Sequence, residues 1–153
     1  MMLIAAMSLG AAGPAAASCF LPADAEGEFR KAVASHPIVF VGVVMGTQAQ
    51  GRSAIVNVIE VWRGPDFPAQ VVVNGSPALE PNAATSVDRT FTPGAKYLFL
   101  PEGNRSPFSD NSCSYTREFT PDLNQLRPAG ARVVAGPPDQ TPDGGFPTVA
   151  VAL

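Results

Sequence analysis

The stretch IVFVGVVMGTQAQGRSAIVNVIEVW, residues 38–62, predicts the centre of the fold. Its two ends, residues 38–46 and 53–62, are rich in β-branched and apolar residues, a composition typical of β-strands. The polar residues 47–53 between them contain a glycine, so the two strands are expected to form a hairpin. Gly42, in the middle of the first strand, predicts a bulge or a tight bend of the kind that small barrels use to turn corners.

Three more strands are predicted on the C-terminal side of this hairpin. They are QVVVN (70–74), AKYLFLPEG (95–103) and SCSYTREF (112–119). On the N-terminal side, residues 24–34 place Phe29 and Val33 on one helical face, and Asp24 can cap the start of the helix. One helix and five short strands predict a mainly β fold, a small antiparallel barrel with the helix packed on it. An immunoglobulin-like sandwich fits less well, because it needs about seven strands.

The two ends of the chain differ in composition from this domain, which we assign to residues 19–128. Residues 1–18 are uncharged and end in small residues, which predicts a cleaved signal peptide; an uncleaved N-terminal anchor is the alternative. Residues 129–153 are rich in proline and glycine and predict a disordered tail. The last six residues, TVAVAL, are apolar but much shorter than the roughly 20 residues of a membrane span. They are expected to be either a frayed end or the beginning of a membrane anchor.

The chain has two cysteines, Cys19 and Cys113. In an exported protein an even number favours a disulfide, because the compartment is oxidising. Closing a loop of that length is expected to stabilise the fold by about 4 to 5 kcal/mol on the chain-entropy model. Another role for Cys19 stays open at this point, namely lipid attachment, which would leave Cys113 unpaired.

Charge and the set of catalytic side chains argue against several functions. The 10 basic and 13 acidic residues give a net charge of −3, so the chain lacks the positive surface that a nucleic-acid backbone requires, and no nucleic-acid partner is expected. His36 is the only histidine and has no partner histidine for a metal site or for acyl transfer. The glycines mark turns and do not open a helix after a strand, so no phosphate-binding loop is predicted. We therefore expect no enzyme activity, no cofactor and no metal site.

Residues 75–93 form a long connection between two predicted strands. The segment is rich in Ser, Pro, Asn and Thr, and its 19 residues exceed ordinary connection lengths. Long connections of this kind are often functional. We expect this loop to contact a protein partner.

Several segments, taken in order, resemble a known family. They are a cysteine directly after a signal peptide, then IVFVGVV, VIEVWRG, VVVNG, PGAKYLFLP and CSYTREF. This set, which spans residues 19–119, is similar to the bacterial relatives of the tissue inhibitors of metalloproteinases and of the netrin-like module. The resemblance implies an OB-like five-stranded barrel with one packed helix, and a disulfide that pins the N-terminal segment to the barrel.

The same resemblance implies a possible inhibitory mechanism. In the inhibitors of that family, the α-amine and carbonyl group of an N-terminal cysteine chelate the zinc of the protease, and the next residue enters its specificity pocket. The matching residues in this chain are Cys19 and Phe20, although CFL stands where the family has Cys-x-Cys. This mechanism requires signal cleavage after Ser18, because cleavage after Ala17 would leave the amine acylated by Ser18.

These observations together predict a secreted or cell-surface protein, and the excess of Arg over Lys with abundant Ala is typical of a GC-rich bacterium. The function we expect is a non-enzymatic binding or structural module with an unidentified protein ligand. The first alternative is a metalloprotease inhibitor that acts through Cys19 and Phe20. The second alternative is a cell-surface lipoprotein lipidated at Cys19. A membrane is expected as a partner only through a terminal anchor.

Overall fold

The predicted hairpin forms the centre of the sheet in a computed structural model that describes residue 19 and residues 22–77, 79–80 and 83–134. Strand β1 (Val39–Gln48) pairs antiparallel with β2 (Ser53–Arg63), and the 3₁₀ turn η1 (Ala49–Gly51) connects them. Residues 54–59 of β2 are alternately buried and half-buried, because successive side chains point to opposite faces of the sheet.

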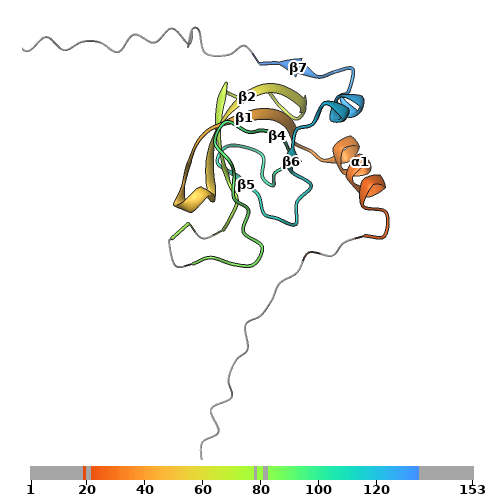
Figure 1. Cartoon of the computed structure of the whole chain (residues 1–153). Helices are drawn as coiled ribbons and strands as arrows, with labels where there is room; N and C mark the ends of the chain where they lie inside the picture. The colour runs from red at the N-terminus through yellow and green to blue at the C-terminus, as the bar shows by residue number, and fades with distance from the viewer. Residues whose placement is uncertain (1–18, 20–21, 78, 81–82, 135–153) are drawn as a thin grey trace, which may run out of the picture.

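The other strands extend this hairpin on both sides (Figure 1). They are β3 (Gln70–Asn74), β4 (Lys96–Phe99), β5 (Phe108–Ser109), β6 (Arg117–Glu118) and β7 (Arg132–Val133). The order across the sheet is β5-β3-β2-β1-β4-β6, and β7 pairs with β2 beyond the end of β3. The β3–β5 pair is parallel, whereas the other pairs are antiparallel. The sheet curls on itself, so the fold is mainly β with a barrel-like shape.

Gly42 lies at a β-bulge, as the sequence predicts. The register between β1 and β2 shifts between Val41 and Gly42. A Cβ atom at Gly42 would lie 2.4 Å from Cγ1 of Val56 and 2.9 Å from the carbonyl oxygen of Asn57. Glycine is needed here because the two strands approach each other more closely than a side chain allows.

The inside of the curled sheet holds a buried cluster of valine and aromatic side chains. Phe40 stacks on Phe99 with ring centroids 4.9 Å apart, and Phe108 lies 5.7 Å from Phe40. All three rings are buried. Burial of such large apolar groups is the main hydrophobic contribution to stability.

The outer face of the sheet is covered in part by helix α1 (Ala25–Ser35), which the sequence predicts (Figure 1). The backbone N–H of Gly27 donates to Oδ1 of Asp24 at 2.8 Å, so Asp24 caps the helix. Phe29 and Val33 face the sheet and form a second buried cluster with residues of β1, β2 and β4. The 3₁₀ helix η2 (Pro121–Leu126) adds Leu123 to this cluster.

The C-terminal strands differ from the sequence prediction. Seven strand segments are present among the described residues, where five are predicted, and β5, β6 and β7 have two residues each. Only Arg117–Glu118 of the predicted strand 112–119 is a strand, because polar side chains bond to the backbone before it and hold a turn. Strand β7 lies within residues 129–153, which the sequence assigns to the tail, so part of that segment belongs to the sheet.

Several sequence predictions concern residues outside the described part. These are the signal peptide, Phe20 and the tail beyond residue 134. Among the described residues, no helix has the length and the apolar character that crossing a membrane requires.

Candidate functional site

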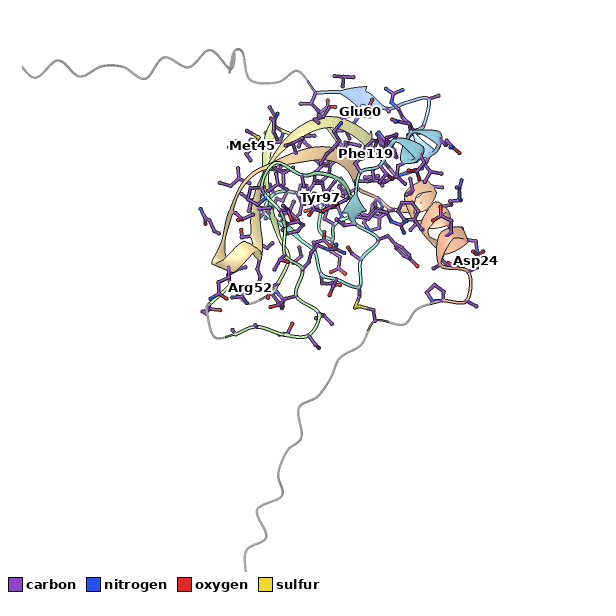
Figure 2. The ribbon with its side chains drawn as sticks, in the orientation of Figure 1. Asp24, Met45, Arg52, Glu60, Tyr97 and Phe119 are labelled. Atoms are coloured by element: carbon purple, nitrogen blue, oxygen red, sulfur yellow. A yellow bond between two sulfur atoms is a disulfide. The ribbon has the colours of Figure 1, made fainter. Side chains whose placement is uncertain are left out.

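The disulfide is the feature around which the candidate site is built. The sulfur atoms of Cys19 and Cys113 lie 2.09 Å apart and their Cα atoms 5.1 Å apart, a distance suited to a disulfide. Figure 2 shows this bridge joining the segment before α1 to a loop of the sheet. The two cysteines singled out in the sequence are therefore brought together. Lipidation of Cys19 would use the same sulfur atom, so the lipid and the bridge exclude each other.

A hollow of about 180 Å³ lies directly beside the bridge. It is lined by Cys19, Pro22, Ala25, Ser112, Cys113, Ser114, Tyr115, Thr116 and Arg117. One wall is thus the segment that leads into α1, and the other is the turn that carries Cys113. The described lining residues offer hydroxyl groups, backbone and one guanidinium group, and none of their side chains is a carboxylate, an imidazole or an amine.

The wall that carries Cys113 is a turn fixed by its own polar side chains. The N–H of Cys113 donates to Oδ1 of Asn111 at 2.8 Å, and the N–H of Thr116 donates to Oγ of Ser114 at 3.1 Å. The N–H of Leu100, in the segment after β4, donates to the buried hydroxyl of Thr116 at 2.9 Å. Such side-chain bonds replace the ladder of a strand and give the loop a defined shape.

A buried charge pair stands behind this wall. The side chain of Asp110 is fully buried, and its Oδ1 lies 3.5 Å from Nε of Arg89. Arg89 also donates from Nε to the carbonyl oxygen of Asn111 at 3.0 Å and from a terminal nitrogen to that of Ser114 at 3.3 Å. The hydroxyl of Ser114 donates to Oδ1 of Asp110. One arginine from the long loop therefore binds the turn at several points.

The carboxyl group of Asp110 is held in an unusual environment. Its burial raises its pKa above the ordinary value, and the nearby Arg89 guanidinium, together with hydrogen bonds from Ser114 and Thr116, opposes this rise. Its second oxygen, Oδ2, is buried and has no hydrogen-bond partner among the described residues. Because this carboxyl group is closed off from solvent, its role is to hold the turn and not to react with a substrate.

The open rim of the hollow carries one cation. The guanidinium carbon of Arg117 lies 3.3 Å from the centroid of the Phe29 ring, and one of its nitrogens lies 3.5 Å from a carboxylate oxygen of Glu26. Both contacts come from α1, so Arg117 ties β6 to the helix at the edge of the hollow. Its side chain remains 40% exposed, which leaves it accessible to a partner.

The other candidate residues of the sequence lie away from this site or outside the described residues. His36 stands at the joint between α1 and β1, where its Nδ1 lies 2.9 Å from the carbonyl oxygen of Ile38. Among the described residues, no three His, Cys, Asp or Glu side chains gather to hold a metal ion. Phe20 is not described.

Sequence reasoning did not find Arg89, and it noted Asp110 beside Cys113 without assigning it a role. A signal is present in the sequence, because Asp88 and Arg89 are the only charged residues between positions 81 and 95. Charged residues in a segment otherwise so poor in charge are candidates for specific pairing.

No protein-family model matches the chain, and no curated protein matches it.

Proposed function

We propose that the chain is an exported binding module and that its curled sheet is an OB-like barrel. The pairing supports this architecture, because β1 joins β2, β2 joins β3 and β3 joins β5. An isolated bridge between Glu102 and Ser109 then connects β5 to the segment after β4, and β4 returns to β1. Five strands linked in this closed order match the small partly open barrel of the OB class. The helix before β1 and the anchored N-terminal segment are what the netrin-like resemblance implies.

The bridged hollow is the observation that carries the proposed binding function. A disulfide fastens the N-terminal segment beside a turn whose shape is fixed by buried polar groups. Loops that are positioned by a rigid scaffold are where binding residues concentrate. Preorganised loops also bind more tightly, because less conformational freedom is lost when the partner arrives. The ligand in this proposal is a protein that contacts the rim formed by residues 112–117.

We propose a binding role rather than a catalytic one because of the side chains that line the hollow. Among the described residues that line the hollow, no side chain can act as a general base at neutral pH, and the ionised side chain is that of Arg117. Asp110 lies behind the wall and is not part of the lining. These features support a surface that recognises a partner.

A site-specific photo-crosslink tests this proposal. The full chain is produced in its own cells with p-benzoylphenylalanine at Ser112, on the wall of the hollow, or at Gln125, which is exposed on η2. We expect a discrete protein adduct from position 112 and none from position 125. Adducts at position 125 alone, or at neither position, would contradict a binding site at the hollow.

A second candidate function is metalloprotease inhibition through the N-terminal amine of Cys19. The observation that favours it is that the bridge holds Cys19 at the edge of the hollow, on the surface of the molecule. A catalytic zinc keeps one coordination position open, and an uncharged amine is a suitable ligand for it.

Two chains that differ by one residue test this second candidate. One begins at Cys19 and the other at Ser18, and both are assayed against a zinc endopeptidase with a fluorogenic peptide. If the amine binds zinc, the chain that begins at Cys19 inhibits and the longer one is weaker by at least about 100-fold, because an amide nitrogen cannot coordinate zinc in the same way. Equal inhibition by both chains, or by neither, would exclude the mechanism.

A further inference from the structure

A second buried charge pair lies at the same end of the molecule as the bridge. Arg52 follows η1 and is 2% exposed. It donates from Nε to the carbonyl oxygen of Ala49 at 3.1 Å, and from a terminal nitrogen to that of Glu80 at 2.7 Å. Its other terminal nitrogen lies 3.2 Å from Oδ2 of Asp88. Figure 2 places Arg52 at the end of the hairpin remote from Glu60.

Asp88 joins this arginine to the long loop. Its Oδ1 accepts from the hydroxyl of Thr85 at 2.6 Å, and its Oδ2 accepts from the N–H of Thr85 at 3.0 Å. Hydrogen bonds from Thr85, the largest cause, and from Ser76 and Arg52 lower the pKa of Asp88 to about 2. The carboxylate is thus ionised at every pH at which the protein is expected to work.

The two pairs meet in one dipeptide, because Asp88 and Arg89 are consecutive. Asp88 reaches the hairpin turn through Arg52, whereas Arg89 reaches the turn of Cys113 through Asp110. Two backbone hydrogen bonds accompany these ion pairs. The N–H of Gly75 donates to the carbonyl oxygen of Arg52, and the N–H of Arg89 donates to the carbonyl oxygen of Gly75. A Cβ atom at Gly75 would lie 2.2 Å from the carbonyl oxygen of Arg89, so the loop packs on itself without a gap.

The chemistry of these pairs suits a positioning role. A buried ion pair adds little net stability over an apolar replacement of similar size, but its directional bonds select one arrangement of the groups around it. Here those groups are carbonyl oxygens of three segments outside the strands, residues 49–52, 79–80 and 110–114. Among residues 83–90 and 111–116, all of them described, no charged side chain is exposed, because Asp88 and Arg89 each pair with a buried partner.

We infer that Asp88 and Arg89 are positioning residues that couple the hairpin turn, the long loop and the turn of Cys113 into one rigid surface. This inference rests on the proposed function, because the surface is the one that carries the hollow. It extends the partner contact from the rim of the hollow to residues 83–90. Residues 83–90 and 111–116 present no exposed charge, and Arg117 on the rim of the hollow is 40% exposed. The partner is therefore a protein that places an acidic side chain against Arg117 and an uncharged face over residues 83–90.

The first test measures how tightly the turn of Cys113 is held. The full chain with its disulfide intact is treated with dithiothreitol under native conditions, and free thiols are counted by mass after alkylation. Arg89→Gln is expected to raise the rate of reduction about tenfold, because the turn opens locally without global unfolding. The matched control is Val58→Ala, a buried core position in β2, which lowers global stability without touching the loops.

The comparison between these variants decides whether the role is one of positioning. If Arg89→Gln and Val58→Ala are reduced at the same rate once their global stabilities are taken into account, Arg89 contributes only to overall stability and the inference fails. Faster reduction in Arg89→Gln alone supports it.

The second test uses hydrogen exchange to ask whether a change at Arg52 reaches the turn of Cys113 through Asp88 and Arg89. Arg52→Met is expected to speed exchange about fivefold at the amides of Ser112 and Cys113, because release of Asp88 loosens Arg89. Faster exchange confined to residues 77–88 would overturn the coupling.

The crosslink at Ser112 separates this inference from the proposed function. Repeated in Arg89→Gln, a weaker adduct together with faster reduction supports both. An adduct in the parent chain with unchanged reduction in the variant overturns the inference and leaves the proposed function intact. Faster reduction in the variant, without any adduct in the parent chain, supports the inference and contradicts the proposed function.

Discussion

The helix-covered side of the sheet and the bridged end are held by different forces. The helix-covered side is an apolar cluster of Phe29, Val33, Val39, Val41, Trp62, Leu98, Leu100 and Leu123. The bridged end is irregular backbone fixed by a disulfide and two buried charge pairs. Apolar burial is non-directional and grows with area, whereas charge-assisted hydrogen bonds fix where particular groups lie. The comparison teaches that the helix-covered side stabilises the fold through buried area, whereas the bridged end restrains the positions of particular groups.

Removing the bridge is expected to have the largest effect. The double variant Cys19→Ser/Cys113→Ser is expected to lose about 4 kcal/mol of unfolding free energy, because the bond restrains a long loop in the unfolded chain. The cysteines are 94 positions apart. Urea denaturation of oxidised parent and variant measures the loss. A loss below about 1 kcal/mol would show that the unfolded chain is already restrained in another way.

Truncation on the helix-covered side is expected to come next. Phe29 is fully buried between α1 and the sheet. Phe29→Ala is expected to cost about 3 to 4 kcal/mol through lost burial and a cavity. The control is Met45→Ala, since Met45 is 52% exposed and its truncation is expected to cost less than about 0.5 kcal/mol. Equal costs for the two variants would contradict the assignment of the apolar cluster as a main source of stability.

The buried pair at the bridged end sharpens the contrast between stability and position. Arg52→Met alone is expected to lower the free energy of unfolding, because it leaves Asp88, whose side chain is 7% exposed, without its cation. Arg52→Met/Asp88→Leu is expected to regain most of that stability while the neighbouring loops still exchange faster than in the parent chain. Denaturation and hydrogen exchange on the same samples check this. Full recovery of both quantities would mean that the pair has no role in loop position.

Lowering the pH is expected to change the stability of the protein through Asp110, which lies at the bridged end. Burial raises the pKa of this carboxyl in the folded protein, so the folded state binds its proton more tightly than the unfolded chain does. As the pH falls from the raised value toward 3.8, this group therefore contributes increasing stability, and that contribution is absent at neutral pH. Asp110→Asn removes it, so the difference in stability between parent and variant is expected to change over this window and to be constant above it. A difference that stays constant with pH would contradict the assignment.

The smallest effect is expected at a surface pair. Nε of Arg132 lies 3.1 Å from Oδ1 of Asp66, and the two side chains are 46% and 95% exposed. Arg132→Gln is expected to change stability by less than about 0.5 kcal/mol, because exposed ion pairs are screened by water. A larger loss in thermal denaturation would show that β7 depends on this contact for its place on β2.

The regular elements could be predicted because each follows from a local pattern. The helix start at Asp24, the hairpin and strand β3 depend on capping, β-branched runs and turn residues that lie close together in sequence. The bulge at Gly42 could be predicted for the same reason. The two cysteines could be paired because only two are present.

The candidate site was harder to predict because its contacts join distant positions. Arg52 and Asp88 are 36 positions apart, and Arg89 binds the carbonyl oxygen of Asn111 from 22 positions away. No periodic pattern reports such pairs. The segment 112–119 alternates as a strand would, but its side chains bond to the backbone and hold a turn, and that competition is visible only once the chain is folded. Strand β7 has two residues, too few for a pattern.

The place where β7 lies has a practical consequence. Figure 1 shows β7 at the end of the molecule remote from the bridge and the long loop. A handle fused after β7 therefore points away from the surface that carries the hollow. On a sensor chip or a bead, attachment through that handle would orient every molecule alike and leave the bridged end open to the solution, which makes it the preferred geometry for a ligand screen.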